Sequence, residues 1–329
     1  RGNQREALRY AELHKMIAGI TLFSQHSTFK RLYDSIVSKN FPLVEIQKHI
    51  LGKKAILYIT KNENDIFAWI IARTYIQPLR LANVYDKLHY ATNEFYNAIS
   101  LLQQAFDYEA IINDIMKPVI KELENYNNII IIPDLYTEFI PFEIIQFNKV
   151  NTALAFMPSL MTAADDMPKV QSIVWVNVLE KDKMLIGYTV KQSQIPYSFD
   201  KIPEGIVITD MPSMYNIAGK RLIVNDEIMN PHYVIINLMN ISISSYFNSL
   251  YMIQNDMNMY ICFNTPITYV NDLLFLREFL SLLQFKGYFY AYTGAIQYIK
   301  DDKRFKNPGY WVGIRFYCRT LKILDGGVR

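Results

Sequence analysis

The chain has 329 residues, of which 51% are apolar and 20% are charged, and its formal net charge is +3. This length allows one large domain or two ordinary ones, with ample apolar material for a core. The small net charge and the lack of a long Lys/Arg block in the sequence argue against a nucleic-acid partner. The two cysteines argue against a disulfide framework and predict a cytoplasmic location.

The sequence predicts no membrane partner. Its first residues do not resemble a signal peptide. The longest uncharged run, residues 228–255, is long enough to span a bilayer. However, it contains Pro231 and His232 and many Asn and Ser residues, so it is not predominantly apolar.

Residues 1–38 are predicted to be helical. Ala7, Leu8, Ala11 and Ile17 recur mostly at three- and four-residue spacing, with charged residues between them. The stretch resembles the last helix of a tetratricopeptide array, in which small residues such as Ala7 and Ala11 let helices pack closely. Other repeats would then lie upstream. An ordinary amphipathic helix fits the spacing equally well.

Two strands and two helices are predicted next. Residues 55–60 and 66–73 are rich in β-branched and aromatic side chains and flank a polar turn at 61–65, a pattern typical of a hairpin. Residues 83–126 return to helical periodicity, in two pieces. Pro118 is expected either in the first turn of a helix or at the join between the two.

The stretch 128–160 is predicted to hold the central strand of the fold. Residues 129–132 are four isoleucines, and such a short β-branched run is typical of a strand that is buried on both faces. Pro133 cannot donate to a sheet ladder, so the strand is expected to end there. A second apolar run at 153–157 predicts another strand.

The second half of the chain is predicted to continue with short strands separated by helical segments. Strands are expected at 172–178, 206–209, 233–238, 259–263 and 311–317, and helices at 273–285 and 288–300. Strands that alternate with helices imply an α/β fold whose mainly parallel sheet is covered by helices on both faces.

Five segments then occur in one order. They are the isoleucine strand with Pro133-Asp134, Ile140-Pro141-Phe142-Glu143, Met157-Pro158-Ser159, and the stretches 219–228 and 295–314. Together they resemble a CHAT domain, the caspase- and separase-like peptidase domain found after tetratricopeptide repeats. The resemblance implies a caspase-like domain at 39–325, with an N-terminal half at 39–165 and a protease-like half at 166–325, preceded by the repeat-type helix at 1–38.

The resemblance also implies where a catalytic dyad would stand. The family's His follows one strand and its Cys follows the next; the matching positions here are Asp210 and, within one residue, Met239. A thioether forms no thiolate and is no nucleophile. A carboxylate with the usual pKa of about 4 is a poor base for a thiol. The chain is therefore expected to be a degenerate CHAT domain with no intact catalytic residue.

A relocated dyad is the competing hypothesis, and Cys262 with His232 would be its pair. Against it, His232 precedes its strand, at the opposite edge of the sheet from the expected site, and Cys262 lies within an apolar run typical of a core. Cys318 ends the last strand, where the family has no catalytic group. A third hypothesis is that the chain supplies only the substrate-binding walls of an assembly.

No cofactor or metal site is predicted. The sequence has no Gly-rich phosphate loop, and its glycines are isolated. Asp165, Asp166, Asp256, Asp301 and Asp302 lack the alternating spacing of a calcium loop. The histidines at 14, 26, 49 and 89 lack metal-ligand spacing.

The resulting functional hypothesis is a catalytically inactive CHAT homologue. It would act as an interaction or regulatory subunit, paired with an active protease or another effector in a bacterial signalling or defence assembly. An active cysteine endopeptidase with a relocated or misaligned dyad is the alternative. Because function belongs to sites rather than to folds, the resemblance alone cannot decide between them.

Overall fold

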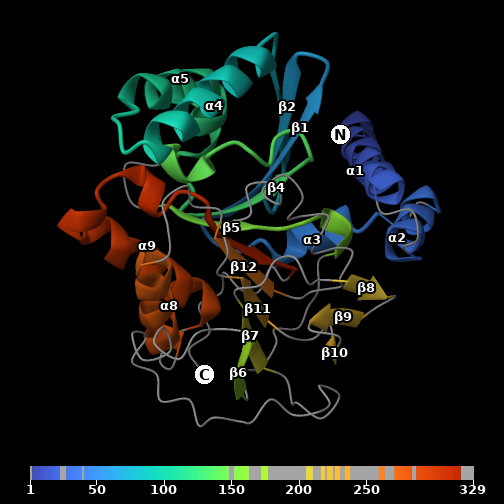
Figure 1. Cartoon of the computed structure of the whole chain (residues 1–329). Helices are drawn as coiled ribbons and strands as arrows, with labels where there is room; N and C mark the ends of the chain where they lie inside the picture. Colours follow the sequence, from blue (N-terminus) through green and yellow to red (C-terminus); the bar gives the residue numbers. More distant parts are fainter. Residues whose placement is uncertain are drawn as a thin grey trace.

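One mixed sheet of ten strands organises the described part of the chain, in the order β3-β2-β1-β4-β5-β13-β12-β11-β7-β6 (Figure 1). A separate three-stranded sheet has the order β10-β9-β8. The structure is a computed structural model that describes residues 2–22, 27–38, 41–147, 152–162, 172–176, 205–209, 216–218, 221–224, 227–229, 234–237, 259–263, 270–283 and 287–319.

The strands of the large sheet are β1 (Lys54–Asn62), β2 (Asp65–Ile71), β3 (Ile76–Leu81), β4 (Asn128–Pro133), β5 (Ala153–Phe156), β6 (Ser172–Val176), β7 (Gly205–Thr209), β11 (Val234–Asn237), β12 (Met259–Phe263) and β13 (Ile314–Cys318). Those of the small sheet are β8 (Asn216–Ala218), β9 (Arg221–Val224) and β10 (Glu227–Met229). The α-helices are α1 (Gly2–Leu22), α2 (Ser27–Val37), α3 (Leu43–His49), α4 (Tyr85–Ser100), α5 (Phe106–Leu123), α8 (Val270–Leu283) and α9 (Tyr288–Asp301).

Parallel pairing dominates the sheet, in two groups that run in opposite directions. β1, β4, β5 and β13 form one parallel group, and β12, β11, β7 and β6 form the other. The groups meet where β13 pairs with β12 in antiparallel register, with Ile314 opposite Phe263. The hairpin strands β2 and β3 complete the β1 side with antiparallel pairs. The predicted α/β class with a mainly parallel sheet is therefore confirmed.

The central strand β4 is buried on both faces, as predicted. Ile129 and Ile131 point to one core cluster and Ile130 and Ile132 to the other, and all four are at most 1% exposed. The strand ends at Pro133. This alternation is the two-residue period of a strand, and both clusters are apolar because helices cover both faces.

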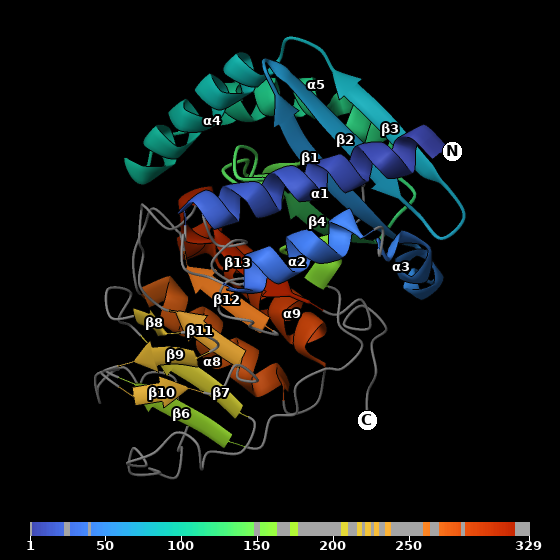
Figure 2. The same ribbon diagram turned by 90° about the vertical axis from the view of Figure 1, so that its right-hand side faces the viewer.

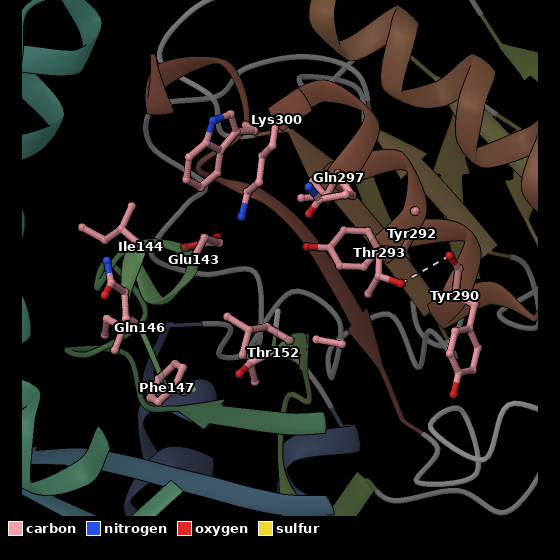
Figure 3. Close-up of a pocket in the computed structure, with 16 residues that line it drawn as sticks. Glu143, Ile144, Gln146, Phe147, Thr152, Tyr290, Tyr292, Thr293, Gln297 and Lys300 are labelled. Carbon is pink, nitrogen blue, oxygen red and sulfur yellow. Dashed lines mark hydrogen bonds between the residues drawn. The ribbon is translucent and has the colours of Figure 1, made fainter. Parts of the chain in front are cut away.

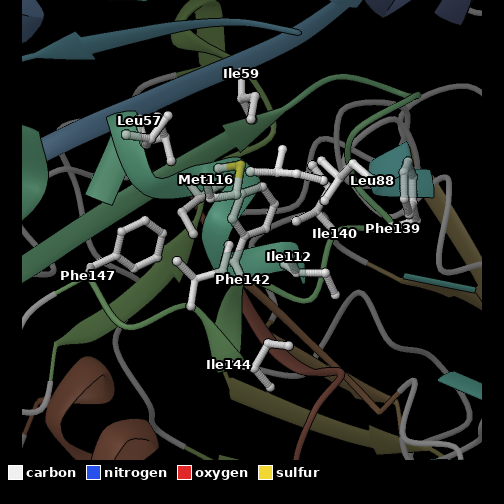
Figure 4. Close-up of a cluster of buried hydrophobic side chains, with 14 of the residues drawn as sticks. Leu57, Ile59, Leu88, Ile112, Met116, Phe139, Ile140, Phe142, Ile144 and Phe147 are labelled. Carbon is white, nitrogen blue, oxygen red and sulfur yellow. The ribbon is translucent and has the colours of Figure 1, made fainter. Parts of the chain in front are cut away.

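Different helices cover the two faces of the sheet. On one face, β1 packs through Leu57 and Ile59 against Leu88 of α4 and Met116 of α5, around Phe142 (Figure 4). On the other face, residues of α1, α3, α8 and α9 share one cluster with alternate residues of β1, β4 and β13. None of the described helices is both long and apolar enough to cross a bilayer.

The predicted N-terminal helix consists of two helices, α1 and α2, in the described residues. Gly19 of α1 lies against Phe29 of α2, where an added Cβ atom would come within 2.4 Å of the aromatic ring. Glycine is thus needed for this close approach. Ala7 and Ala11 pack against the core of the sheet face, and Figure 2 shows α1 lying across that face.

One strand was not predicted, and two local predictions were wrong. Strand β3 was not predicted, because its Pro78 interrupts an otherwise weak pattern; at the edge of a sheet, a proline costs no ladder hydrogen bond. Pro118 lies inside α5 rather than in a first turn or at the join, and the buried neighbours Met116 and Val119 hold the helix around it. The last strand begins at Ile314, after a turn that includes Trp311.

Candidate functional site

A cavity of about 640 Å³ opens between the loop after β4 and helix α9 (Figure 3). The loop 143–147, the start of β5, one face of α9 and Trp311 form its walls. Its lining is mixed, with apolar side chains such as Ile144 and Ile296 beside the charged Glu143 and Lys300. This combination of apolar walls and a few polar groups is typical of ligand pockets.

The cavity lies beside the start of β5, at the same end of the large sheet as the last residues of β7, β11 and β12. Trp311, which precedes β13, lines the cavity, and Ile314 at the start of β13 pairs with Phe263, the last residue of β12. Asn237 at the end of β11 is in register with Cys262 and with Thr209, the last residue of β7. Ligands of open α/β sheets bind outside the carboxyl ends of the strands. The cavity lies at that end of the sheet, but its described lining comes from the loop after β4, the start of β5, helix α9 and Trp311 rather than from β7, β11 or β12.

Glu143 and Arg315 form a buried ion pair beside the cavity. The guanidinium Nε donates to Glu143 Oε1 at 2.7 Å and Nη2 donates to Oε2 at 3.3 Å, with the two side chains 3% (Arg315) and 8% (Glu143) exposed. Arg315 also donates to the backbone carbonyls of Glu138 and Ile140. The planar guanidinium matches a carboxylate with two hydrogen bonds. The pair therefore fixes the loop 138–143 to strand β13.

Lys300 contributes an ammonium group to the cavity from the last turn of α9. Its Nζ lies 4.1 Å from the centroid of the Trp311 ring, and Figure 3 shows it pointing into the cavity on the side of Glu143. Burial lowers the pKa of Lys300 below its ordinary value, and the nearby Glu143 carboxylate opposes that change. The cavity thus holds a partly desolvated cation on an aromatic face.

Hydroxyl groups on α9 fix the opposite wall. The Tyr292 hydroxyl donates to the carbonyl of Ile314 at 2.8 Å, so α9 is tied to the first residue of β13. The Thr293 hydroxyl donates to the carbonyl of Tyr290 at 3.3 Å (Figure 3). Because both hydroxyl protons are used within the protein, these groups shape the wall rather than offer donors to a ligand.

Cys262 lies in the sheet interior, one residue from the end of β12. It is 2% exposed, and its Sγ donates to the carbonyl of Arg315 at 3.9 Å. Burial, together with the Glu138 and Glu143 carboxylates, raises the pKa of the Cys262 thiol, and the opposing effect of Arg315 is smaller than that of burial. A nucleophile needs an accessible thiolate. In its described position, the Cys262 thiol is neither accessible to a substrate nor favoured to ionise to a thiolate.

Of the other predicted site residues, one is described by the structure and the rest are not. Cys318 ends β13 and is fully buried in the core that α8 and α9 cover. Asp210, Met239 and His232 lie outside the described residues, as do the acidic residues 165, 166 and 256. Among the described residues, no group of three or more His, Cys, Asp or Glu side chains could hold a metal ion.

Sequence reasoning missed the charged residues of the cavity. Glu143 was singled out as part of a motif but was given no role, and Lys300 and Arg315 were not considered. One signal was available: Arg315 interrupts an apolar strand, and an arginine at such a position is rarely buried without a partner. Its partner is 172 positions away, and that distance could not be inferred from spacing.

A second buried polar cluster joins α1 to the ends of β4 and β5. Lys15 Nζ donates to the carbonyls of Pro133 and Pro158, the latter at 2.6 Å. Glu12 accepts hydrogen bonds from the Ser159 hydroxyl and, at 3.1 Å, from the Leu160 amide. Burial raises the pKa of Glu12 and lowers that of Lys15, and each residue's charge opposes the change in the other.

Asp134 organises the loop that follows β4. Its carboxylate accepts hydrogen bonds from the Thr60 hydroxyl at 2.5 Å, from the Lys61 amide at 2.9 Å and from the Thr137 hydroxyl at 2.8 Å. The residues Asp134, Glu143 and Ser159, each from one of the motifs recognised in the sequence, thus make structural hydrogen bonds that hold loops to strands.

Comparison with protein families and with curated proteins found no family model that matches the chain and no curated protein that matches it.

Proposed function

We propose that the chain is a degenerate CHAT-type domain that works by binding proteins rather than by cleaving them. One observation carries the proposal. β7 and β11 are neighbouring parallel strands whose last residues, Thr209 and Asn237, are in register. A peptidase of this group carries its imidazole and its thiol after two such strands. In this sequence, the strand ends are followed by Asp210 and, two positions on, by Met239.

The residue types at those positions argue against hydrolysis. A thioether has no proton to lose and cannot form the thiolate that attacks a peptide carbonyl. A carboxylate can orient a base, but it is a weak base towards a thiol. With both members replaced, the scaffold lacks the pair of groups on which covalent catalysis depends.

The described position of Cys262 argues against its use as the nucleophile. Cys262 is the described thiol nearest to the expected edge, but it is buried in the strand and its proton is directed to the Arg315 carbonyl. The competing hypothesis, a peptidase that uses Cys262 with His232, would require β12 to open before the thiol could react.

The buried ion pair and the loop hydrogen bonds support the proposal that the folded domain acts by binding other proteins. Glu143 with Arg315 holds the loop after β4 to β13, and Ser159 with Glu12 holds the loop after β5 to α1. Maintaining this framework without a dyad leaves its surfaces and its cavity available for recognition. We propose a role as an interaction or regulatory subunit beside an active protease or another effector, in the cytoplasm of a bacterium and in a defence or signalling assembly.

Peptide cleavage tests the proposal directly. The purified chain and its Cys262→Ala and Cys318→Ala variants are incubated with a broad peptide library, and products are read by mass spectrometry. We expect no cleavage by any of the three. Cleavage by the unmodified chain that disappears in Cys262→Ala alone would establish the peptidase alternative. In a second arm, the chain is added to a peptidase that co-purifies with it, and we expect the rate of that peptidase to change.

A further inference from the structure

The cavity beside α9 has the size and the lining of a small-ligand site. Its volume of about 640 Å³ falls within the roughly 300–1,000 Å³ that is common for such sites. Ile144, Ile296 and the ring of Trp311 provide apolar surface. The charged groups of Glu143 and Lys300 lie on one side, whereas neutral polar side chains such as Thr152 and Gln297 lie elsewhere around the cavity (Figure 3). A ligand that fits would therefore have a largely apolar body and a charged group at one end, where Glu143 and Lys300 lie.

The charged side chains that the structure describes at the cavity carry one positive charge in excess. Both oxygens of the Glu143 carboxylate accept hydrogen bonds from Arg315, so these two charges neutralise each other. Among the described residues, Lys300 Nζ makes no hydrogen bond or ion pair; its contact is with the face of Trp311. Of the three charged side chains that the structure describes here, the Lys300 ammonium is thus the one without a hydrogen-bonded counter-ion, and it points into the cavity on the side of Glu143 (Figure 3).

We propose that this cavity binds a carboxylate-bearing ligand, with the anion paired to the Lys300 ammonium and the apolar body lying against Ile144, Ile296 and Trp311. A partly desolvated ammonium group is stabilised by a carboxylate, because the carboxylate carries the opposite charge and accepts its hydrogen bonds. The carboxylate comes either from an acidic side chain of a peptide or from a small organic acid. The site rests on the cavity alone and does not depend on the proposed function.

The surroundings favour a single negative charge over a phosphate group. Phosphate sites usually combine several backbone amides at a helix N-terminus, or use an arginine fork. Lys300 instead lies in the last turn of α9, where the helix dipole is negative, and Arg315 is already engaged by Glu143. With one ammonium group to pair with, and with the negative end of α9 close by, the cavity suits a ligand with one negative charge better than one with two.

The site is tested by titration with two matched pairs of probes. One pair is 3-phenylpropionate and 3-phenylpropionamide; the other is acetyl-Ala-Glu-Ala-amide and acetyl-Ala-Gln-Ala-amide. Binding is followed by tryptophan emission, and a Trp311→Phe variant identifies the part of the signal that comes from the cavity. The protein variants are Lys300→Met, Lys300→Arg and Lys303→Met. Lys303 is exposed three positions further along the chain and serves as the control.

We expect at least one acid to bind more tightly than its amide. Lys300→Met should weaken that binding by at least about tenfold, the factor that corresponds to the loss of one charge-assisted hydrogen bond. Lys300→Arg should retain most of it, and Lys303→Met should leave it unchanged. Binding of the phenylpropionate alone would identify a small organic acid, and binding of the Glu peptide would identify an acidic peptide.

Three results would overturn the proposal. One is that neither acid binds at any soluble concentration. Another is that the neutral amide binds as well as the acid. The third is that Lys300→Met and Lys303→Met weaken binding equally. The unfolding midpoint of each variant is measured beside the titrations. If Lys300→Met is less stable, Lys300→Arg separates the two causes of weaker binding: it keeps the positive charge, so it should still bind if the charge matters and should not if the cavity wall is disturbed.

Discussion

The carboxylate of Glu12 accepts a hydrogen bond from the hydroxyl of Ser159, which lies 147 positions further along the chain. Glu12 is on α1 and Ser159 follows β5, so this bond joins the N-terminal helix to the end of a central strand. Both side chains are fully buried. Lys15, one helical turn along α1, donates to backbone carbonyls at the ends of β4 and β5. The helix is therefore attached to the sheet by polar contacts as well as by apolar packing.

Replacing Glu12 with alanine should strongly destabilise the protein. The substitution leaves the Ser159 hydroxyl and the Leu160 amide buried without their acceptor. It also removes the negative charge that favours the charged form of the buried Lys15, and leaving a buried charge without its counter-charge typically costs about 3–5 kcal/mol. Urea denaturation followed by circular dichroism measures the change in the free energy of unfolding. Glu6→Ala is the matched control, because Glu6 lies on the same helix, is 52% exposed and pairs with Arg9. We expect a change below about 1 kcal/mol there; similar losses in both variants would contradict the contribution assigned to Glu12.

Arg315 should contribute more to stability than an arginine in an exposed ion pair. Arg315→Met removes the charged partner of the buried Glu143 and the hydrogen bonds that Arg315 donates to two backbone carbonyls, so we expect a loss of about 3–5 kcal/mol. Arg80→Met provides the comparison, because Arg80 pairs with Asp65 from a side chain that is 63% exposed. Its loss should stay below about 1 kcal/mol. Equal losses in the two denaturation curves would contradict the assignment.

A double-mutant cycle separates the ion pair from the rest of the Arg315 contacts. Glu143→Gln is combined with Arg315→Met, and the interaction energy is the difference between the double variant and the sum of the single ones. We expect a clearly nonzero interaction, because the two side chains are in direct contact. Strict additivity would indicate that Arg315 is stabilised mainly by its bonds to the carbonyls of Glu138 and Ile140.

The strands were predictable where one local pattern dominates. Four consecutive isoleucines followed by Pro133 define both the burial and the end of β4, because a continuous β-branched run suits a strand covered on both faces. β3 escaped prediction because Pro78 weakens its pattern. Its strand conformation comes from pairing with β2, where Pro78 stands opposite Trp69, and a single sequence carries no record of that pairing.

The cavity was not predictable for a related reason. Glu143 and Arg315 are 172 positions apart, and Lys300 reaches Trp311 only because two short 3-10 helices, Lys303–Phe305 and Pro308–Tyr310, reverse the chain between them. Each residue alone has the pattern of an ordinary helix or strand position. The motif that contains Glu143 marked the right loop, but the role of the carboxylate depends on a partner from the last strand.

Asp302 should titrate at an unusually low pH. The Arg304 side chain and then the Arg304 amide donate to its carboxylate and lower the pKa of Asp302 to about 2. Because this pKa is depressed below the unfolded value of 3.8, the stabilisation is present above that value and is lost as the pH falls towards 2. Carbon-detected NMR titration of the carboxyl group measures the pKa. Arg304→Gln should raise it, whereas Lys303→Gln should not; an unchanged value in Arg304→Gln would show that another group lowers it.

The two thiols should be unreactive in the folded protein. Cys262 and Cys318 are buried in neighbouring strands, and burial raises the pKa of the Cys262 thiol, so little thiolate is present at neutral pH. We expect a maleimide to modify both residues rapidly in denaturant and only slowly without it, as followed by mass spectrometry. Ser100→Cys, at the exposed end of α4, is the control and should add one rapidly labelled thiol. Rapid labelling of Cys262 in the folded chain would instead show an accessible nucleophile, and would favour the peptidase alternative over a binding subunit.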